Sequence, residues 1–147
     1  MMVEPLVDSV LGELRYNAKL GWYDADVQWC GASASMSLSV EQVDDLPGAA
    51  ATAKALLEGQ TTWQARMMEA VVRDLLDLKN GEWFDPEHDA APYTPETLVA
   101  PLTLEGATIF ADGTATFFFE DGNLFFGHTI LVAVDTASGD VTADLAG

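Results

Sequence analysis

The stretch Asp85-Pro86-Glu87-His88-Asp89 places three carboxylates and one imidazole within five residues. Carboxylate oxygens bind hard cations, and zinc or manganese would also accept the histidine. The calcium-loop pattern with a central glycine and a closing glutamate is absent, and no second histidine lies four residues away. Asp85, Glu87, His88 and Asp89 are therefore the candidate metal ligands, although a solvated acidic loop explains the same pattern better.

Catalytic groups of other kinds are scarce. Nucleophilic catalysis needs a serine, cysteine or threonine beside a base, yet the only histidines are His88 and His128 and no Gly-x-Ser-x-Gly motif occurs. We expect Cys30 to be a small buried residue and His128 to be held inside the packing of a strand. Glycine-rich phosphate loops are absent too. We therefore predict no catalytic residues and no cofactor.

Three pairs of neighbouring aromatic residues stand out: Trp22-Tyr23, Trp83-Phe84 and Phe125-Phe126. Successive side chains of a strand point to opposite faces, so each pair must pack in two layers of the core or turn one ring outward. Aromatic anchors often dominate the binding energy of interfaces, and rings amid carboxylates suit a basic partner. The candidate partner-binding residues are Trp22, Tyr23, Asp24, Asp26, Trp83 and Phe84.

Acidic residues outnumber basic ones by 24 to six, which gives a formal net charge of −18. Without a Lys/Arg cluster the chain cannot replace the counterions of phosphates, so we expect no direct contact with nucleic acid or anionic membranes. The same charge attracts a basic protein and speeds the encounter at low salt. Solubility in general, or adaptation of the cell to salt, would explain the acidity equally well.

The 147 residues match the size of one ordinary domain, and we expect a single domain over residues 1–147. Almost half of the residues are apolar, which excludes a disordered chain. The longest apolar stretches, such as Ile130 to Val134, are too short to cross a bilayer, and residues 1–5 do not begin a secretory signal. A single cysteine allows no internal disulfide, so we expect a cytoplasmic protein.

The spacing of apolar residues indicates the elements that must position these groups. Alternation of serine with apolar residues over 33–40 is typical of a half-buried strand, and the pairs Asp112-Gly113, Asp121-Gly122 and Ser138-Gly139 are typical of turns. Strands are expected at 11–16, 22–29, 33–40, 103–110, 114–120, 124–134 and 141–145, and helices at 45–57, 63–79 and briefly from Pro95.

This order of elements predicts the α+β class. We expect an antiparallel mixed-order sheet from an N-terminal three-strand block and a C-terminal meander, with two central antiparallel helices packed on one face. The strand at 124–134 is apolar on both faces and should be central, with further cover on its second side. Residues 1–10 are expected to form a loosely ordered N-terminal arm.

Several short motifs carry a resemblance to one bacterial family. They are Leu11-Gly12-Glu13-Leu14 with Trp22-Tyr23 and Trp29, Leu75-Leu76-Asp77-Leu78-Lys79-Asn80 with Trp83, Asp121-Gly122 with Leu124-Phe125 and Gly127-His128-Thr129-Ile130, and the closing Gly139-Asp140, Ala143-Asp144 and Leu145-Ala146-Gly147. From about Leu11 to Gly147 the chain resembles the bacterial domain of unknown function 2262. Turn glycines and strand aromatics imply a shared fold, and the resemblance implies no particular reaction.

Three functional hypotheses follow. The leading one is an acidic binding protein of the immunity or adaptor type that engages a basic protein, such as a toxin, because small acidic α+β proteins often accompany bacterial toxin systems. The second is an inhibitor whose carboxylates imitate the phosphates of a nucleic acid, which requires regularly spaced acids along one surface. The third is a metal-dependent enzyme that uses the Asp85–Asp89 loop.

Overall fold

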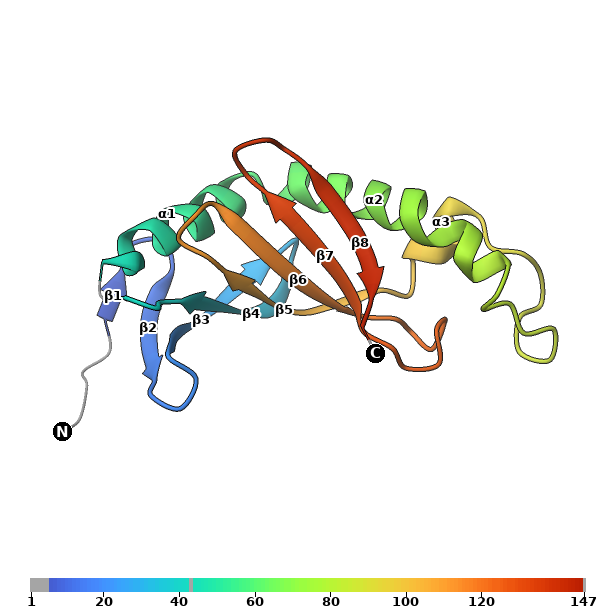
Figure 1. Cartoon of the computed structure of the whole chain (residues 1–147), viewed down its shortest axis with the longest axis horizontal. Helices are drawn as coiled ribbons and strands as arrows, with labels where there is room; N and C mark the ends of the chain where they lie inside the picture. Colours follow the sequence, from blue (N-terminus) through green and yellow to red (C-terminus); the bar gives the residue numbers. More distant parts are fainter. Residues whose placement is uncertain (1–5, 43, 147) are drawn as a thin grey trace.

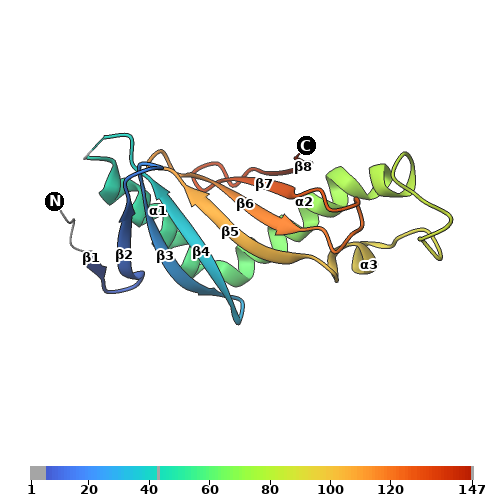
Figure 2. The same cartoon turned by 90° about the horizontal axis from the view of Figure 1, so that it is seen from below.

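The computed structural model of the chain describes residues 6–42 and 44–146. Within them, eight strands form one sheet in the order of the sequence, from β1 to β8 (Figures 1 and 2). Neighbouring strands are antiparallel except β4 and β5, which run parallel. The strands are β1 (Leu6–Asp8), β2 (Gly12–Asn17), β3 (Trp22–Trp29), β4 (Ala32–Ser39), β5 (Thr103–Ile109), β6 (Thr114–Glu120), β7 (Ile130–Asp135) and β8 (Val141–Leu145).

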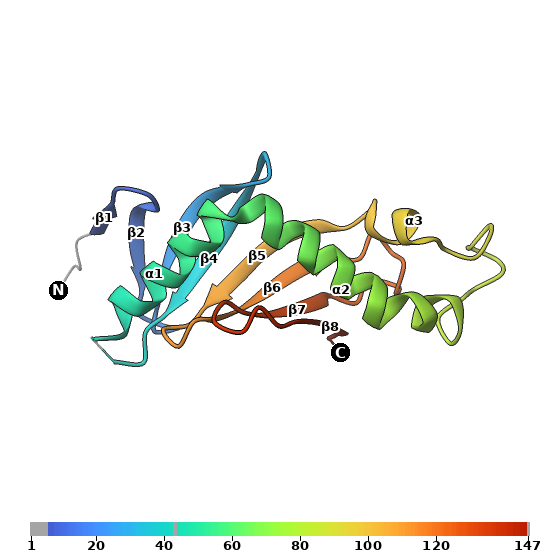
Figure 3. The same ribbon diagram turned by 90° about the horizontal axis from the view of Figure 1, so that it is seen from above.

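The helices occupy the long connection between the two parallel strands, where a crossover is required. They are α1 (Asp45–Glu58), α2 (Gln60–Asn80) and α3 (Pro95–Val99), and Figure 3 shows α1 and α2 on one face of the sheet. Helix α1 packs on β4 and β5, whereas α2 packs on β7 and β8. Leu56 and Leu75 from the helices and Phe117 and Val132 from the sheet are fully buried between the layers. The predicted α+β class is confirmed.

The relative direction of α1 and α2 differs from the prediction. Only Gly59 separates the two helices, and its φ of −102° is not a left-handed conformation that would reverse the chain. An antiparallel helix pair needs a connecting loop of about two to five residues. The helices therefore follow one another across the sheet and meet at an angle, as Figure 3 shows, instead of lying side by side.

Part of the predicted N-terminal arm forms a strand, β1. Leu6–Asp8 pairs antiparallel with β2, and the Asp8 carboxylate lies 2.7 Å from the ammonium of Lys54 on α1. The hydrogen bond from Lys54, followed by those from the amides of Leu11 and Val10, lowers the pKa of Asp8 to about 2. This ion pair connects the edge strand to the helix layer. Residues 1–5 of the predicted arm lie outside the described residues.

The strand predicted at 124–134 begins only at Ile130, because residues 122–127 form a series of turns. Strand β7 is also not central, since β8 alone follows it at the edge of the sheet. Ala133 is exposed and Leu131 is half-buried, and the second face of the sheet has no further layer within residues 6–42 and 44–146 (Figure 2). The apolar character of 124–134 thus reflects a packed loop and not a strand buried on both faces.

Candidate functional site

Lys79, in the last turn of α2, is almost completely buried, with 1% of its surface exposed. Its ammonium donates hydrogen bonds to Asp89 Oδ2 and to the carbonyl oxygen of Trp83, each at 2.9 Å. The rings of Tyr93, Phe125 and Phe126 lie 5.3 to 5.9 Å from the same nitrogen. A buried charge needs such partners, so Lys79 fixes the segment after α2 against the loop before β7.

Asp89 is the carboxylate that neutralises Lys79. Besides Lys79, it accepts hydrogen bonds from the amide of Asp85 and the hydroxyl of Tyr93, each at 2.8 Å. These contacts, the Asp85 amide first and then Lys79 and Tyr93, lower the pKa of Asp89 to about 2. The bond to Asp89 likewise raises the pKa of the Tyr93 phenol. Asp89 is therefore a structural counter-ion.

The predicted metal ligands do not form a ligand group. Asp89 is turned inward to Lys79, Asp85 Oδ1 accepts from the amide of Glu87, and the side chains of Glu87 and His88 are exposed. Across the described part of the chain, no group of three or more His, Cys, Asp or Glu side chains is placed to hold a metal ion. Local hydrogen bonds engage the carboxylates of Asp85 and Asp89, and the carboxylate of Glu87 is exposed to solvent.

A second carboxylate holds the loop between β6 and β7. Asp121 is 5% exposed and accepts hydrogen bonds from the amides of Asn123, Phe125 and Gly127 at 2.8 to 3.0 Å. One side chain thus satisfies three backbone donors in a loop without strand pairing. It holds the loop in a conformation in which Phe126 has a φ of +57°, which residues with side chains rarely adopt.

The strained conformation turns Phe126 outward, with 52% of its surface exposed. Its ring is stacked with Trp83 at 6.0 Å, and Trp83 contacts Phe125 and His128 edge to face at 5.6 and 4.9 Å. We call Trp83, Phe125, Phe126 and His128 the aromatic end of the molecule. Strained backbone often marks functional sites, so this exposed ring is the main functional candidate.

Carboxylates surround the aromatic end. His128 also lines a cavity of about 300 Å³ together with the exposed residues Glu105 and Glu120. Glu82 is exposed beside Trp83, and no ion pair within residues 6–42 and 44–146 neutralises any of these three glutamates. The aromatic end therefore presents the exposed ring of Phe126 and the half-buried ring of Trp83 near unpaired carboxylates, which suits a cationic partner.

The predicted partner-binding residues fall into two separate groups. Trp22, Tyr23, Asp24 and Asp26 lie on β3, whereas Trp83 and the half-buried Phe84 lie in the segment after α2, at the opposite end of the molecule (Figure 1). In the first group, Asp26 forms an exposed ion pair, the Asp24 carboxylate accepts a hydrogen bond, and Tyr23 packs against another tyrosine ring. The buried Trp22 Nε1 has no acceptor within the described residues. The two groups do not form one patch.

The structure contradicts the predictions for two single residues, Cys30 and His128. Cys30 is not buried but exposed, because Cys30 and Gly31 form the two-residue turn between β3 and β4, with φ values of +49° and +87°. This geometry is typical of hairpin turns. His128 lies in the loop before β7 and not within a strand, and its Nδ1 donates to the carbonyl oxygen of Phe125. Within the described residues, the hydrogen bonds of Cys30 are with Gln60 and that of the His128 ring is with Phe125, so the two residues are not paired with each other.

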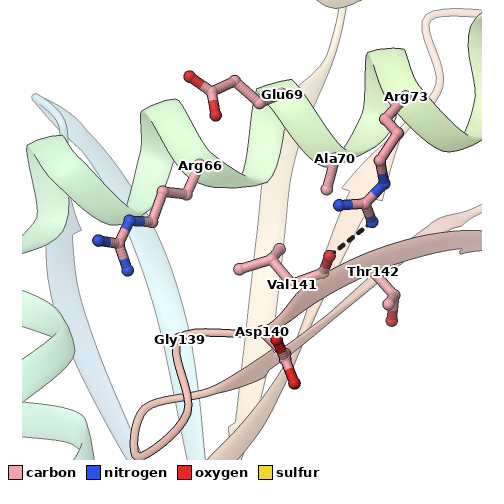
Figure 4. A pocket seen from close by; sticks show the side chains of 8 residues that line it. All are labelled: Arg66, Glu69, Ala70, Arg73, Gly139, Asp140, Val141 and Thr142. Atoms are coloured by element: carbon pink, nitrogen blue, oxygen red, sulfur yellow. Dashed lines mark hydrogen bonds between the residues drawn. The ribbon is translucent and has the colours of Figure 1, made fainter.

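Two side chains of α2 form hydrogen bonds with the backbone of the edge strand β8. Figure 4 shows a cavity of about 640 Å³ between α2 and β8, in which Arg73 points at the carbonyl oxygen of Val141, 2.6 Å away. Asp74 accepts from the amide of Ala143 at 2.9 Å and forms two hydrogen bonds with Arg73. Their mutual contact raises the pKa of Arg73 and lowers that of Asp74. The pair thus occupies backbone groups that a further strand would need.

We expect the double variant Arg73→Ala/Asp74→Ala to self-associate more than the wild type. The substitutions free the outward-facing groups of Val141 and Ala143, and an unprotected edge pairs with other chains. Sedimentation velocity over a concentration series measures the shift. The matched control Arg15→Ala/Asp26→Ala removes an exposed ion pair away from this edge. Equal association of both double variants would contradict the protective role.

Comparison with known proteins places the chain in a wider group. A family model described as an uncharacterized protein conserved in bacteria (DUF2262) matches residues 8–145. No curated protein and no solved structure matches the chain. Within the described residues, none of the helices combines the length and the apolar composition needed to span a membrane.

Proposed function

The chain belongs to the bacterial DUF2262 family, and from the geometry and charge of this chain we propose that it is a binding protein of the immunity or adaptor type. It engages a basic protein, such as a toxin, and performs no chemistry of its own. A reducing compartment such as the cytoplasm suits the exposed Cys30 thiol. The aromatic end supplies the anchor and the net charge of −18 supplies long-range attraction.

The single observation that carries this proposal is the conformation of Phe126. A large apolar ring is half exposed, at 52%, on a backbone with φ of +57°. Such a conformation costs a residue with a side chain about 1–2 kcal/mol, so folding alone favours glycine here. The fixed loop also reduces the ordering cost of association. A partner that buries the ring explains why phenylalanine occupies this position.

The charge distribution supports a basic partner. Four of the six basic residues, Arg15, Lys54, Arg73 and Lys79, are already paired with carboxylates of the same chain. Most of the 24 acidic residues therefore form no ion pair within residues 6–42 and 44–146. Such a field accelerates association with a positively charged protein and weakens as salt screens it.

Phe126→Gly is expected to weaken partner binding about 30-fold while the free energy of unfolding changes by less than about 1 kcal/mol. Glycine adopts φ of +57° without strain, and this gain offsets most of what is lost with the ring: the stacking with Trp83, worth about 0.5–1.5 kcal/mol, and the contact with the Lys79 ammonium. Affinity capture from a lysate of the source bacterium, read by mass spectrometry at low and moderate salt, compares the wild-type and variant baits.

The control for this capture is Phe110→Gly, which removes another exposed phenylalanine from the turn between β5 and β6. That turn lies at the other end of the sheet from the aromatic end (Figure 1). We expect one basic protein on the wild-type and control baits at low salt, and a depleted signal on Phe126→Gly. Capture of nothing specific, or equal capture by Phe126→Gly, would argue against the proposed function.

A further inference from the structure

A second surface of the helix layer has the features of a docking groove. Between α2 and α3 lies an open groove of about 420 Å³, whose apolar lining includes Ala65, Met68, Val72 and Val99. Ala65 is exposed, and Met68, Val72 and Val99 are only half-buried. Apolar grooves on soluble proteins often mark binding sites, and a methionine adapts its shape to different occupants.

The charges around the groove are negative. Glu69 on α2 and Glu96 on α3 line it, are exposed, and form no ion pair within the described residues. The one basic residue at the groove, Arg73, has its charge neutralised by Asp74 and donates to the Val141 carbonyl at the edge of β8. An occupant of complementary chemistry therefore combines apolar side chains with basic ones.

The backbone around the groove favours a helical occupant. The wall formed by α2 is a helix of 21 residues whose backbone groups are hydrogen-bonded within it, the five-residue α3 offers no continuous row of free backbone groups, and the sheet edges lie elsewhere. An extended peptide in this groove would find no row of backbone donors and acceptors to pair with. A helix satisfies its own backbone and presents apolar side chains three and four residues apart.

We propose that the groove between α2 and α3 binds a basic amphipathic helix of the protein partner. This inference rests on the proposed function. It gives the partner a second contact surface, in addition to the aromatic end. Apolar side chains of the partner helix fill the space over Met68, Val72 and Val99, and its Lys or Arg residues face Glu69 and Glu96. Val72 precedes Lys79 by seven residues, about 10 Å along α2, and the ammonium of Lys79 contacts the ring of Phe126. One partner surface can therefore reach both the groove and the aromatic end.

The test uses a fluorescent peptide of about 18 residues that forms an amphipathic helix, with leucines on one face and lysines on the other. Its binding is measured by fluorescence anisotropy with the wild type, Ala65→Asp and Ala51→Asp. Ala51 is an exposed alanine of α1, so its variant carries the same charge change outside the groove. Ala65→Asp adds a negative charge, so if the basic peptide bound only by electrostatic attraction, this variant would bind it more tightly than the wild type.

We expect Ala65→Asp to weaken binding at least about tenfold, because it places a carboxylate within the apolar lining, whereas Ala51→Asp binds like the wild type or slightly better. A peptide of the same composition in scrambled order is expected to bind at least about tenfold more weakly. Thermal unfolding checks that both variants are folded. If Ala65→Asp is unfolded, Ala65→Asn replaces it, because asparagine places a polar side chain in the same apolar lining without a charge.

Three results would overturn the groove proposal: wild-type affinity or better in the groove variant, equal binding of the scrambled peptide, or no binding of the helical peptide to the wild type. The proposed function is judged separately, by capture of a basic protein on the wild-type and Phe126→Gly baits. If that capture depends on Phe126 while the peptide binds the wild type and the groove variant equally, the partner contacts the aromatic end and not the groove.

Discussion

Lys79→Met is expected to lower the free energy of unfolding by about 3–5 kcal/mol, because it leaves the Asp89 carboxylate buried without its counter-ion. Methionine keeps the apolar stem, so packing changes little and the loss reports the missing charge. The hydrogen bond to the Trp83 carbonyl and the contacts with three aromatic rings disappear as well. Urea unfolding followed by tryptophan fluorescence measures the difference.

Two further variants separate the loss of the buried ion pair from the general effect of replacing a lysine with methionine. Lys19→Met removes a lysine that is exposed and forms no ion pair within residues 6–42 and 44–146, so it should change stability by less than about 0.5 kcal/mol. Lys79→Met/Asp89→Asn removes both charges and is expected to recover part of the loss. If Lys79→Met is as stable as Lys19→Met, the buried pair does not hold this end of the molecule together.

Asp121→Ala is expected to cost about 2–3 kcal/mol and to weaken partner binding together with stability. The change leaves three amides without an acceptor, and the amide of Phe125 is buried, where a lost hydrogen bond is expensive. Since the same loop orients Phe126, its ring loses its fixed position. Urea unfolding and partner titration of the same variant measure both effects.

The control for the loop is Asp112→Ala, in the turn between β5 and β6. Asp112 also precedes a glycine and accepts a backbone hydrogen bond, from the amide of Thr114, but it is exposed. Water can satisfy the freed donor there, so we expect a loss below about 1 kcal/mol and normal binding. Similar losses in both variants would mean that Asp121 is an ordinary turn residue.

Much of the sheet could be predicted from the sequence because its strands alternate clearly. Ala34, Met36 and Leu38 are buried while the serines between them are exposed or half-buried, as the period of two requires. The glycine turns after Asp112 and after Ser138 were also placed correctly, since local backbone preferences decide them. The parallel pairing of β4 with β5 joins strands more than 60 residues apart. No local pattern indicates it.

The candidate site was predicted less well, although one signal was available. Met67, Val71 and Leu75 recur every four residues, and Lys79 continues this series onto the buried face of α2. A pattern of apolar residues alone does not include this lysine, although the spacing does. No comparable signal predicts the exposure of Phe126, because its backbone conformation depends on the three hydrogen bonds that Asp121 accepts from the folded loop.

The most direct test of the binding account is the kinetics of the purified complex as a function of salt, with wild type and Phe126→Gly in parallel. Charge steering predicts that the association rate constant falls steeply as salt rises, equally for both proteins. Loss of the anchor predicts a dissociation rate constant about 30-fold higher for Phe126→Gly at every salt concentration. An association rate indifferent to salt, together with unchanged dissociation of the variant, would contradict the account.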